Sequence, residues 1–164
     1  MISMIRVDER LIHGQVALIW TKHLGVNRII VVNDKAASDV ILSSTLKMAA
    51  PDTVKVIVLA KKDVIKLLSD ARIQQLNILI VVDSPADARF VVDHVEGVKK
   101  VNIGNFGRVL TSKEPRMKLN DNVYLSNQDK EDLKSIIDRG IQTEYQLVPD
   151  QSVLDLKKYF NKGE

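Results

Sequence analysis

The sequence predicts an α/β protein with a mainly parallel, doubly wound open sheet, helices on both faces, and an antiparallel edge near the C-terminus. Short segments rich in Val and Ile alternate with segments of helical periodicity almost to the end of the chain. Segments 28–32 and 77–82 are apolar throughout after their first residue, as in strands covered on both faces. Segment 141–147 instead alternates apolar and polar residues, which favours an edge strand with one solvated face.

Five brief segments are predicted to be the strands of the parallel sheet. They are residues 5–7, 28–32, 54–59, 77–82 and 100–103. A chain of 164 residues, of which 45% are hydrophobic, supplies enough apolar material for one core. We therefore expect a single domain over residues 1–164.

Amphipathic helices are predicted between these strands. Apolar residues recur at the spacing of one helix face at Val64, Leu67, Leu68 and Ala71, and again at Ala88, Val91, Val92 and Val95. Ser84 and Pro85 supply an N-cap hydroxyl and a first-turn proline to the second of these helices. Gly25 and Gly140 follow helices where a left-handed residue is usual.

The last third of the chain departs from this alternation. Residues 104–126 contain Gly104, Gly107 and the run 120–122 of Asn and Asp, which favour a loop and a hairpin-like excursion. After the alternating segment 141–147, a closing helix is expected to carry Leu156, Tyr159 and Phe160.

Composition narrows the function classes. The chain has no cysteine, which excludes disulfides and thiolate metal sites, and it has no apolar run near the roughly 18 to 20 residues of a membrane span. No secretory signal precedes the first strand, so an intracellular protein is expected. The formal charge of +3 is dispersed along the chain, and only 4% of residues are aromatic. The composition therefore does not favour a nucleic-acid-binding protein.

Polar residues follow four of the predicted strands. They are Asp8 to Gln15, then Asn33 and Asp34, then Asp83 and Ser84, and finally Gly104 and Asn105. Ligands of open parallel sheets bind beyond the carboxyl ends of the strands. We therefore expect one rim that brings these groups together.

His13 is the leading candidate for chemistry at this rim. A helix that begins at Gly14 or Gln15 would point its free amides and positive dipole end at the imidazole, and Arg10 adds to the same field. We therefore expect a neutral, nucleophilic ring near pH 7. The same amides and the paired donors of Arg10 would hold an anion, most naturally phosphate, and Gly14 leaves room for close approach.

Ordinary structural roles also account for several of these residues. His23 and His94 fall in the last turns of helices, where positive charge is favoured. Arg6 and Asp8 are two residues apart, so in an extended chain they point to the same side and can form a simple salt bridge. Asn33, Asp34 and Ser84 can serve as turn and cap residues alone.

The stretch from Ile5 to Val16 resembles the active-site loop of IIB subunits of the mannose/fructose/sorbose family of the bacterial sugar phosphotransferase system. Its Arg-x-Asp-x-Arg-x-x-His-Gly-Gln spacing is long and specific. Four further segments, 31–39, 48–51, 101–104 and 138–141, are also similar to this family. The resemblance runs through most of the chain.

The resemblance implies a phosphocarrier, a protein-histidine:sugar phosphotransferase with a phosphohistidine intermediate. A IIA phosphohistidine would donate to Nδ1 of His13, which would pass the group to a sugar arriving through membrane subunits IIC and IID. Arg10 and the amides of Gly14 and Gln15 would hold the phosphoryl oxygens. Arg6 and Asp8 would orient the loop, with Asn33, Asp34 and Ser84 as further supporting residues.

The resemblance implies neither metal nor cofactor. It implies a cytoplasmic protein held at the inner face of the cell membrane through IIC and IID. Because residue 1 already opens the IIB pattern, a separate IIB subunit is expected. A homodimer is compatible on general grounds, since two-fold dimers are the commonest oligomers. The transported sugar is left open.

Two alternatives from other functional classes are also compatible with the sequence. A receiver-like or nucleotide-binding regulatory module would use Asp8, Asp34 or Asp83 with magnesium, although these acids are scattered and no glycine-rich phosphate loop occurs. Magnesium-dependent aspartyl phosphate would identify it. A non-enzymatic module would use the mildly basic surface, and salt-sensitive binding to nucleic acid or anionic lipid would identify that.

Overall fold

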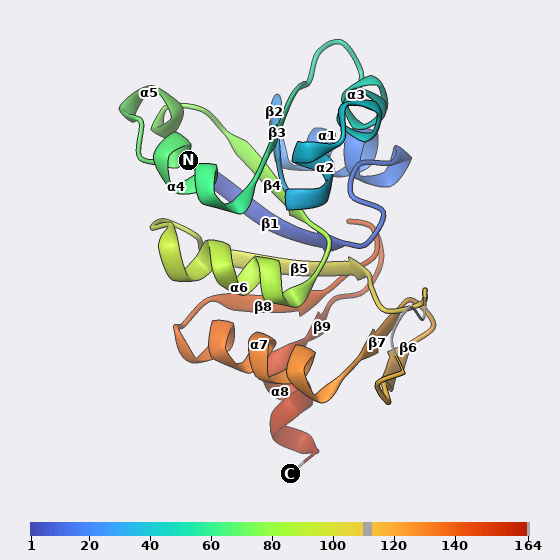
Figure 1. Cartoon of the computed structure of the whole chain (residues 1–164). Helices are drawn as coiled ribbons and strands as arrows, with labels where there is room; N and C mark the ends of the chain where they lie inside the picture. The colour runs from blue at the N-terminus through green and yellow to red at the C-terminus, as the bar shows by residue number, and fades with distance from the viewer. Residues whose placement is uncertain (110–112, 164) are drawn as a thin grey trace.

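A seven-stranded sheet runs through the computed structural model, which describes residues 1–109 and 113–163 (Figure 1). Its strand order is β3-β2-β4-β1-β5-β8-β9. The strands are β1 Ile2–Asp8, β2 Arg28–Val32, β3 Lys55–Leu59, β4 Ile78–Val82, β5 Lys100–Asn105, β8 Gln142–Tyr145 and β9 Leu154–Asp155. All neighbours pair parallel except β9, which lies antiparallel on β8. The five predicted parallel strands and the antiparallel edge are confirmed.

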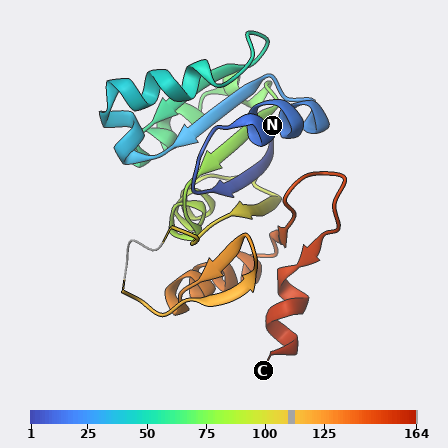
Figure 2. The same ribbon diagram turned by 90° about the vertical axis from the view of Figure 1, so that its right-hand side faces the viewer.

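Helices cover both faces of this sheet (Figures 1 and 2). One core contains residues of the π-helix η1, Gln15–Trp20, and of α2, Asp34–Ser38, and α3, Val40–Met48, with α1, Thr21–Leu24, continuing η1. The opposite core contains residues of α4 Lys61–Leu68, α5 Ala71–Gln74, α6 Pro85–His94, α7 Asn127–Asp138 and α8 Leu156–Lys162. The doubly wound α/β class is confirmed.

Alternation along β1 directs polar side chains toward the site. Ile5 and Val7 pack into the core beside α4 and α6, while Met4 packs into the core beside η1. Because successive side chains of a strand point to opposite faces, Arg6 and Asp8 share the face of Met4. That face is the one covered by the helix that follows His13.

The C-terminal third corrects two expectations for segment 141–147, because β8 is an interior strand that pairs parallel with β5 and is not an edge strand. The predicted hairpin exists as β6 Met117–Asn120 and β7 Val123–Leu125, and the predicted closing helix exists as α8. The solvated face expected for 141–147 is wrong, because Glu144 is 1% exposed and Gln146 is 8% exposed. β8 lies between β5 and β9, and its polar side chains belong to a buried hydrogen-bond network described below.

The residues predicted to begin and end helices have these roles in the structure. Gly25 and Gly140 have φ of 64° and 79°, the left-handed conformation that glycine adopts at little cost. The hydroxyl of Ser84 caps α6. Across the part of the chain that the structure describes, no helix has the length and apolarity needed to cross a bilayer. Part of the loop expected within residues 104–126 lies outside the described residues, at 110–112.

Candidate functional site

A tight turn follows β1 and places Arg10 and His13 back against the end of that strand. The amide of Leu11 donates to the carbonyl of Asp8 at 2.8 Å, and Leu11 adopts a left-handed φ of 57°. Such a φ costs a branched residue on the order of 1 kcal/mol or more. The side chain of Leu11 is buried in the core beside η1, and this burial offsets the strain. Sequence patterns gave no sign of this conformation.

His13 contacts the carboxylate of Asp8. Its Nε2 lies 3.0 Å from Oδ2 of Asp8, and 17% of its side chain is exposed. An ionised carboxylate only accepts hydrogen bonds, so Nε2 carries the hydrogen of the neutral ring. Within residues 1–109 and 113–163, Nδ1 has no hydrogen-bond partner. In its neutral form the imidazole therefore presents Nδ1 with its lone pair available.

Asp8 is completely buried and is held in its ionised form. Burial alone would raise its pKa, but the hydrogen bond from His13, the positive charge of Arg6 and the hydrogen bond from Asn105 outweigh burial and hold the pKa below its ordinary value. The amide of Asn105 donates to Oδ2 at 3.1 Å, and the backbone amide of Arg10 donates to Oδ1 at 3.2 Å. Asp8 is therefore a fixed negative charge behind the imidazole.

Arg6 supplies the buried counter-charge. Its guanidinium is fully buried, pairs with Asp8 at 3.3 Å and lies 5.2 Å from the ring centre of Trp20. Burial lowers the pKa of Arg6 to about 10, with Asp8 acting in the opposite direction. A Cβ at position 104 would lie 1.7 Å from Nη2 of Arg6, so Gly104 provides the space that the guanidinium occupies.

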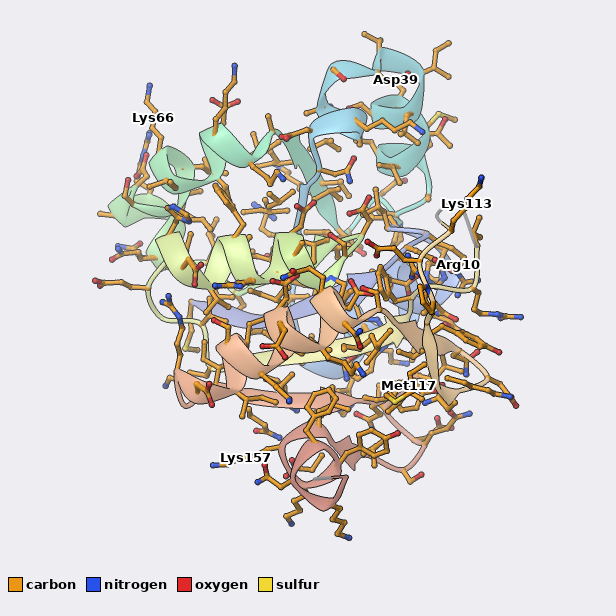
Figure 3. All side chains as sticks on the ribbon, turned by 60° about the horizontal axis from the view of Figure 1, so that its bottom comes forward. Arg10, Asp39, Lys66, Lys113, Met117 and Lys157 are labelled. Atoms are coloured by element: carbon orange, nitrogen blue, oxygen red, sulfur yellow. The ribbon has the colours of Figure 1, made fainter. Side chains whose placement is uncertain are left out.

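Arg10 lies at the surface of the site, at the same end of the molecule as the β6–β7 hairpin that carries Met117 (Figure 3). Its side chain is 52% exposed, its Nε lies 3.6 Å from Oδ1 of Asp8, and it donates to Oε1 of Gln15 at 3.4 Å. Most of its donors thus face solvent. Gly14 precedes η1 without a side-chain cap, and a Cβ there would meet open space.

The loop after β5 is tied to the same site. The amide of Glu9 donates to the carbonyl of Asn105 at 2.8 Å, and the amide of Gly107 donates to the carboxylate of Glu9 at 3.0 Å. These bonds hold residues 105–107 beside the turn that carries Arg10 and His13. The predicted convergence of the ends of β1 and β5 is therefore present.

The ends of β2 and β4 form a separate cluster. Asn33 caps α2 and donates to Asp83 at 2.7 Å, Asp34 accepts from the amide of Lys61 at 2.8 Å, and Ser84 caps α6. Over the described ranges, no hydrogen bond or ion pair joins this cluster to His13 or Arg10. Direct bonds between described residues therefore do not join the two parts of the expected rim, and the contacts of Asn33, Asp34 and Ser84 are those of turn and cap residues.

The other two histidines occupy helix ends. His23 lies in the last turn of α1, edge-on to Trp20 with the ring centres 5.8 Å apart. His94 ends α6, where its Nδ1 lies 2.8 Å from the carbonyl of Phe90 and its ring stacks on the ring of Phe90. Both positions fit the structural roles expected for these histidines.

Sequence reasoning placed Asn105 at the expected rim but missed Asn102, which also lies on β5. Both residues are buried. A polar residue inside an otherwise apolar strand was the available signal, as in Asn102 between Val101 and Ile103. Only the pairing of Arg6 with Asn102 across the sheet shows which partner that polar residue serves.

Comparisons with known proteins identify the family of this chain. The family profile described as PTS system sorbose subfamily IIB component matches residues 2–164. A probable phosphotransferase enzyme IIB component of Streptococcus pyogenes serotype M6 is 44% identical over 108 residues, 66% of each protein. The PTS system mannose-specific EIIAB component of Escherichia coli K12 is 30% identical over 98% of this chain, and the match spans 50% of the length of that relative.

The fold is also similar to that of a solved IIB domain. The crystal structure of the IIBSor domain of the sorbose permease from Klebsiella pneumoniae superposes with a TM-score of 0.89 at 24% identity, covering 100% of this chain and 98% of that one. At this identity the likeness concerns the fold, whereas the sequence match over nearly the whole chain establishes the family. The chain belongs to the sorbose subfamily of IIB components of the sugar phosphotransferase system.

Proposed function

We propose that this chain is a phosphocarrier that takes a phosphoryl group from a IIA component onto Nδ1 of His13 and passes it to a sugar during uptake. Family membership supports the overall reaction, because IIB components of this system take phosphate from IIA and pass it to the sugar. The observation that carries the residue assignment is the 3.0 Å contact between Nε2 of His13 and Asp8, which leaves Nδ1 as the free ring nitrogen.

The transfer balances without a net proton movement. The lone pair of Nδ1 attacks phosphorus, the bond from phosphorus to the donor imidazole breaks, and the donor ring keeps that electron pair. His13 retains its hydrogen on Nε2, so the phosphorylated ring bears a positive charge. The carboxylate of Asp8 stabilises that charge at hydrogen-bond distance. When a sugar hydroxyl oxygen attacks phosphorus, the bond to Nδ1 breaks and Nδ1 keeps its electron pair. The hydroxyl proton passes to solvent water, and the neutral ring returns.

Arg10 is proposed to hold the phosphoryl oxygens, with the backbone amides of Gly14 and Gln15 completing the cradle. The guanidinium is exposed and only loosely bound to Gln15 at 3.4 Å, so it can turn toward an arriving anion. Helix amides without a side-chain cap favour anions. A carrier must also release its group, and one guanidinium with a few amides makes a suitably weak cradle.

The partners follow from this role. IIA is the phosphoryl donor and the sugar is the acceptor, reached through the membrane subunits IIC and IID. The chain would act as a single IIB domain in the cytoplasm, held at the inner face of the membrane by IIC and IID. Its reaction would use neither a metal nor a cofactor, because positioning and charge stabilisation by side chains suffice for phosphoryl transfer between imidazoles.

Phosphoryl transfer from labelled phosphoenolpyruvate through the general components and IIA tests this proposal. The wild-type chain should acquire one acid-labile, alkali-stable phosphoryl group. The His13→Ala variant should acquire none, and the matched His23→Ala variant should be labelled like the wild type. Full labelling of the His13→Ala variant would overturn the assignment, and an alkali-labile, magnesium-dependent label would instead indicate an aspartyl phosphate.

A further inference from the structure

A run of buried polar side chains leads from His13 across neighbouring strands on one face of the sheet. Asp8 and Arg6 lie on β1, Asn102 lies beside them on β5, and Glu144 lies beside Asn102 on β8. Arg6, Asp8 and Asn102 are 0% exposed and Glu144 is 1% exposed. Burial of four polar side chains in one run is costly unless each has a partner, so the run calls for a physical reason.

Asn102 links the two charged parts of this run. Its Oδ1 accepts from Nη1 of Arg6, and its Nδ2 donates to Oε1 of Glu144 at 3.4 Å. Glu144 is itself neutralised by Lys100 at 2.9 Å, so it provides an acceptor without leaving an uncompensated charge. With its amide donor directed to Glu144, Asn102 can present only its oxygen to Arg6.

The guanidinium of Arg6 is fixed on several sides. Nη1 donates to the carbonyl of Gln146 at 2.7 Å as well as to Asn102, and Nη2 donates to the carbonyl of Leu147 at 3.1 Å and to Asp8 at 3.3 Å. The space that it fills is bounded by Gly104. A rotation of Arg6 would therefore withdraw the positive charge that keeps Asp8 ionised behind His13.

We propose that Asn102 is a positioning residue for phosphoryl transfer, which holds Arg6 against Asp8 and thereby keeps the hydrogen of His13 on Nε2 and its nucleophilic lone pair on Nδ1. This inference rests on the proposed role of His13. Asn102 touches neither His13 nor the transferred group, and it acts through two intervening side chains. Its contribution lies in the tautomer and orientation of the imidazole, beyond any contribution to stability.

Three charged side chains surround the imidazole of His13. Asp8 faces Nε2 from β1, Arg10 approaches Asp8 from the turn, and Arg6 lies behind Asp8. Asn105 faces Asp8 from β5 as a neutral donor. Because Asn102 is also neutral, its replacement by another neutral residue changes the hydrogen bonding of Arg6 without adding charge to the site.

The test compares Asn102→Leu and the smaller Asn102→Ala with Asn102→Gln, which keeps a neutral amide with an acceptor for Arg6 and a donor for Glu144. The readout is ¹⁵N NMR of the unphosphorylated full chain, in which the shifts of the two His13 ring nitrogens report which one carries hydrogen. Thr143→Val is the control, since Thr143 is a buried polar residue on β8 whose hydroxyl bonds only to the carbonyl of Ile141 among the contacts described.

We expect Asn102→Leu and Asn102→Ala to populate the tautomer with hydrogen on Nδ1 and to slow phosphoryl acceptance roughly 10-fold. Asn102→Gln should keep the Nε2 tautomer, and Thr143→Val should leave it unchanged. Whichever of Asn102→Leu and Asn102→Ala folds supplies the decisive result. If that variant keeps the wild-type tautomer and rate while losing stability, Asn102 is structural only and the inference is overturned. A wild-type chain that is not phosphorylated on His13 would instead refute the proposed function, independently of the NMR result.

Discussion

Replacement of Asp8 by asparagine perturbs the site at the atom on which the proposed chemistry depends most. The Asp8→Asn change would keep an oxygen near Nε2 of His13 but would remove the negative charge that Arg6 and the phosphorylated imidazole share. A hydrogen bond to a charged group contributes about 1.5 to 3 kcal/mol, and each 1.36 kcal/mol is a factor of ten in rate. We therefore expect phosphoryl acceptance to slow by roughly 10- to 100-fold.

The same substitution should destabilise the fold, because it leaves the fully buried Arg6 without its carboxylate. Removal of one partner from a buried pair costs about 3 to 5 kcal/mol, and urea unfolding at pH 7 measures this loss. Because the pKa of Asp8 is lowered in the folded protein, its stabilisation is complete above the ordinary value of about 3.9 and is lost as the pH falls through the lower folded value.

Rapid-quench measurement of phosphoryl transfer from IIA, at saturating donor, separates this effect from weaker docking. Asp83→Asn is the matched control, since Asp83 follows the neighbouring strand β4 and bonds to Asn33 in the separate cluster. The reasoning would be refuted if Asp8→Asn transferred within two-fold of the wild type, or if Asp83→Asn were slowed equally.

Three further substitutions test other parts of the site. Arg10→Ala should change the free energy of unfolding by less than about 1 kcal/mol, because the side chain is 52% exposed, and should slow transfer at least 10-fold by quench-flow; an unchanged rate would remove Arg10 from the mechanism. Gly104→Ala should cost about 3 kcal/mol or more in urea unfolding, because its Cβ would overlap the Arg6 guanidinium; a neutral effect would show that Arg6 moves freely. Asp83→Asn should raise the melting temperature at pH 7, because burial and the nearby Asp87 raise the pKa of Asp83, so its charge opposes folding above the ordinary value; this gain should vanish below about pH 4.

The sheet was readable from sequence because apolar strand segments and helix periodicity are local signals. Segments 28–32 and 77–82 match β2 and β4 closely, and the antiparallel edge exists at β9. The side of β8 that carries Glu144 could not be read in the same way. An alternating strand that buries its polar residues looks like one that exposes them, and only the buried Arg6 distinguishes the two.

The site was partly predictable because some of its residues lie close together along the chain. Arg10 and His13 share one local turn, and their proximity to Asp8 follows from a few residues of chain. The direct contact between Asp8 and Nε2 depends on the left-handed turn at Leu11. A glycine would have suggested such a conformation, but a leucine does not. The contribution of Asn102 depends on the register between β1 and β5, which spacing along the chain does not give.

The ring nitrogen that binds phosphorus decides the central claim most directly. Phosphorylation of a ¹⁵N-histidine-labelled chain through IIA, followed by NMR detection of the one-bond coupling between ³¹P and ¹⁵N under alkaline conditions, identifies that atom. With Nε2 held by Asp8 at 3.0 Å, the coupling should appear at Nδ1 of His13. Coupling at Nε2 of His13, or at His23 or His94, would contradict the account.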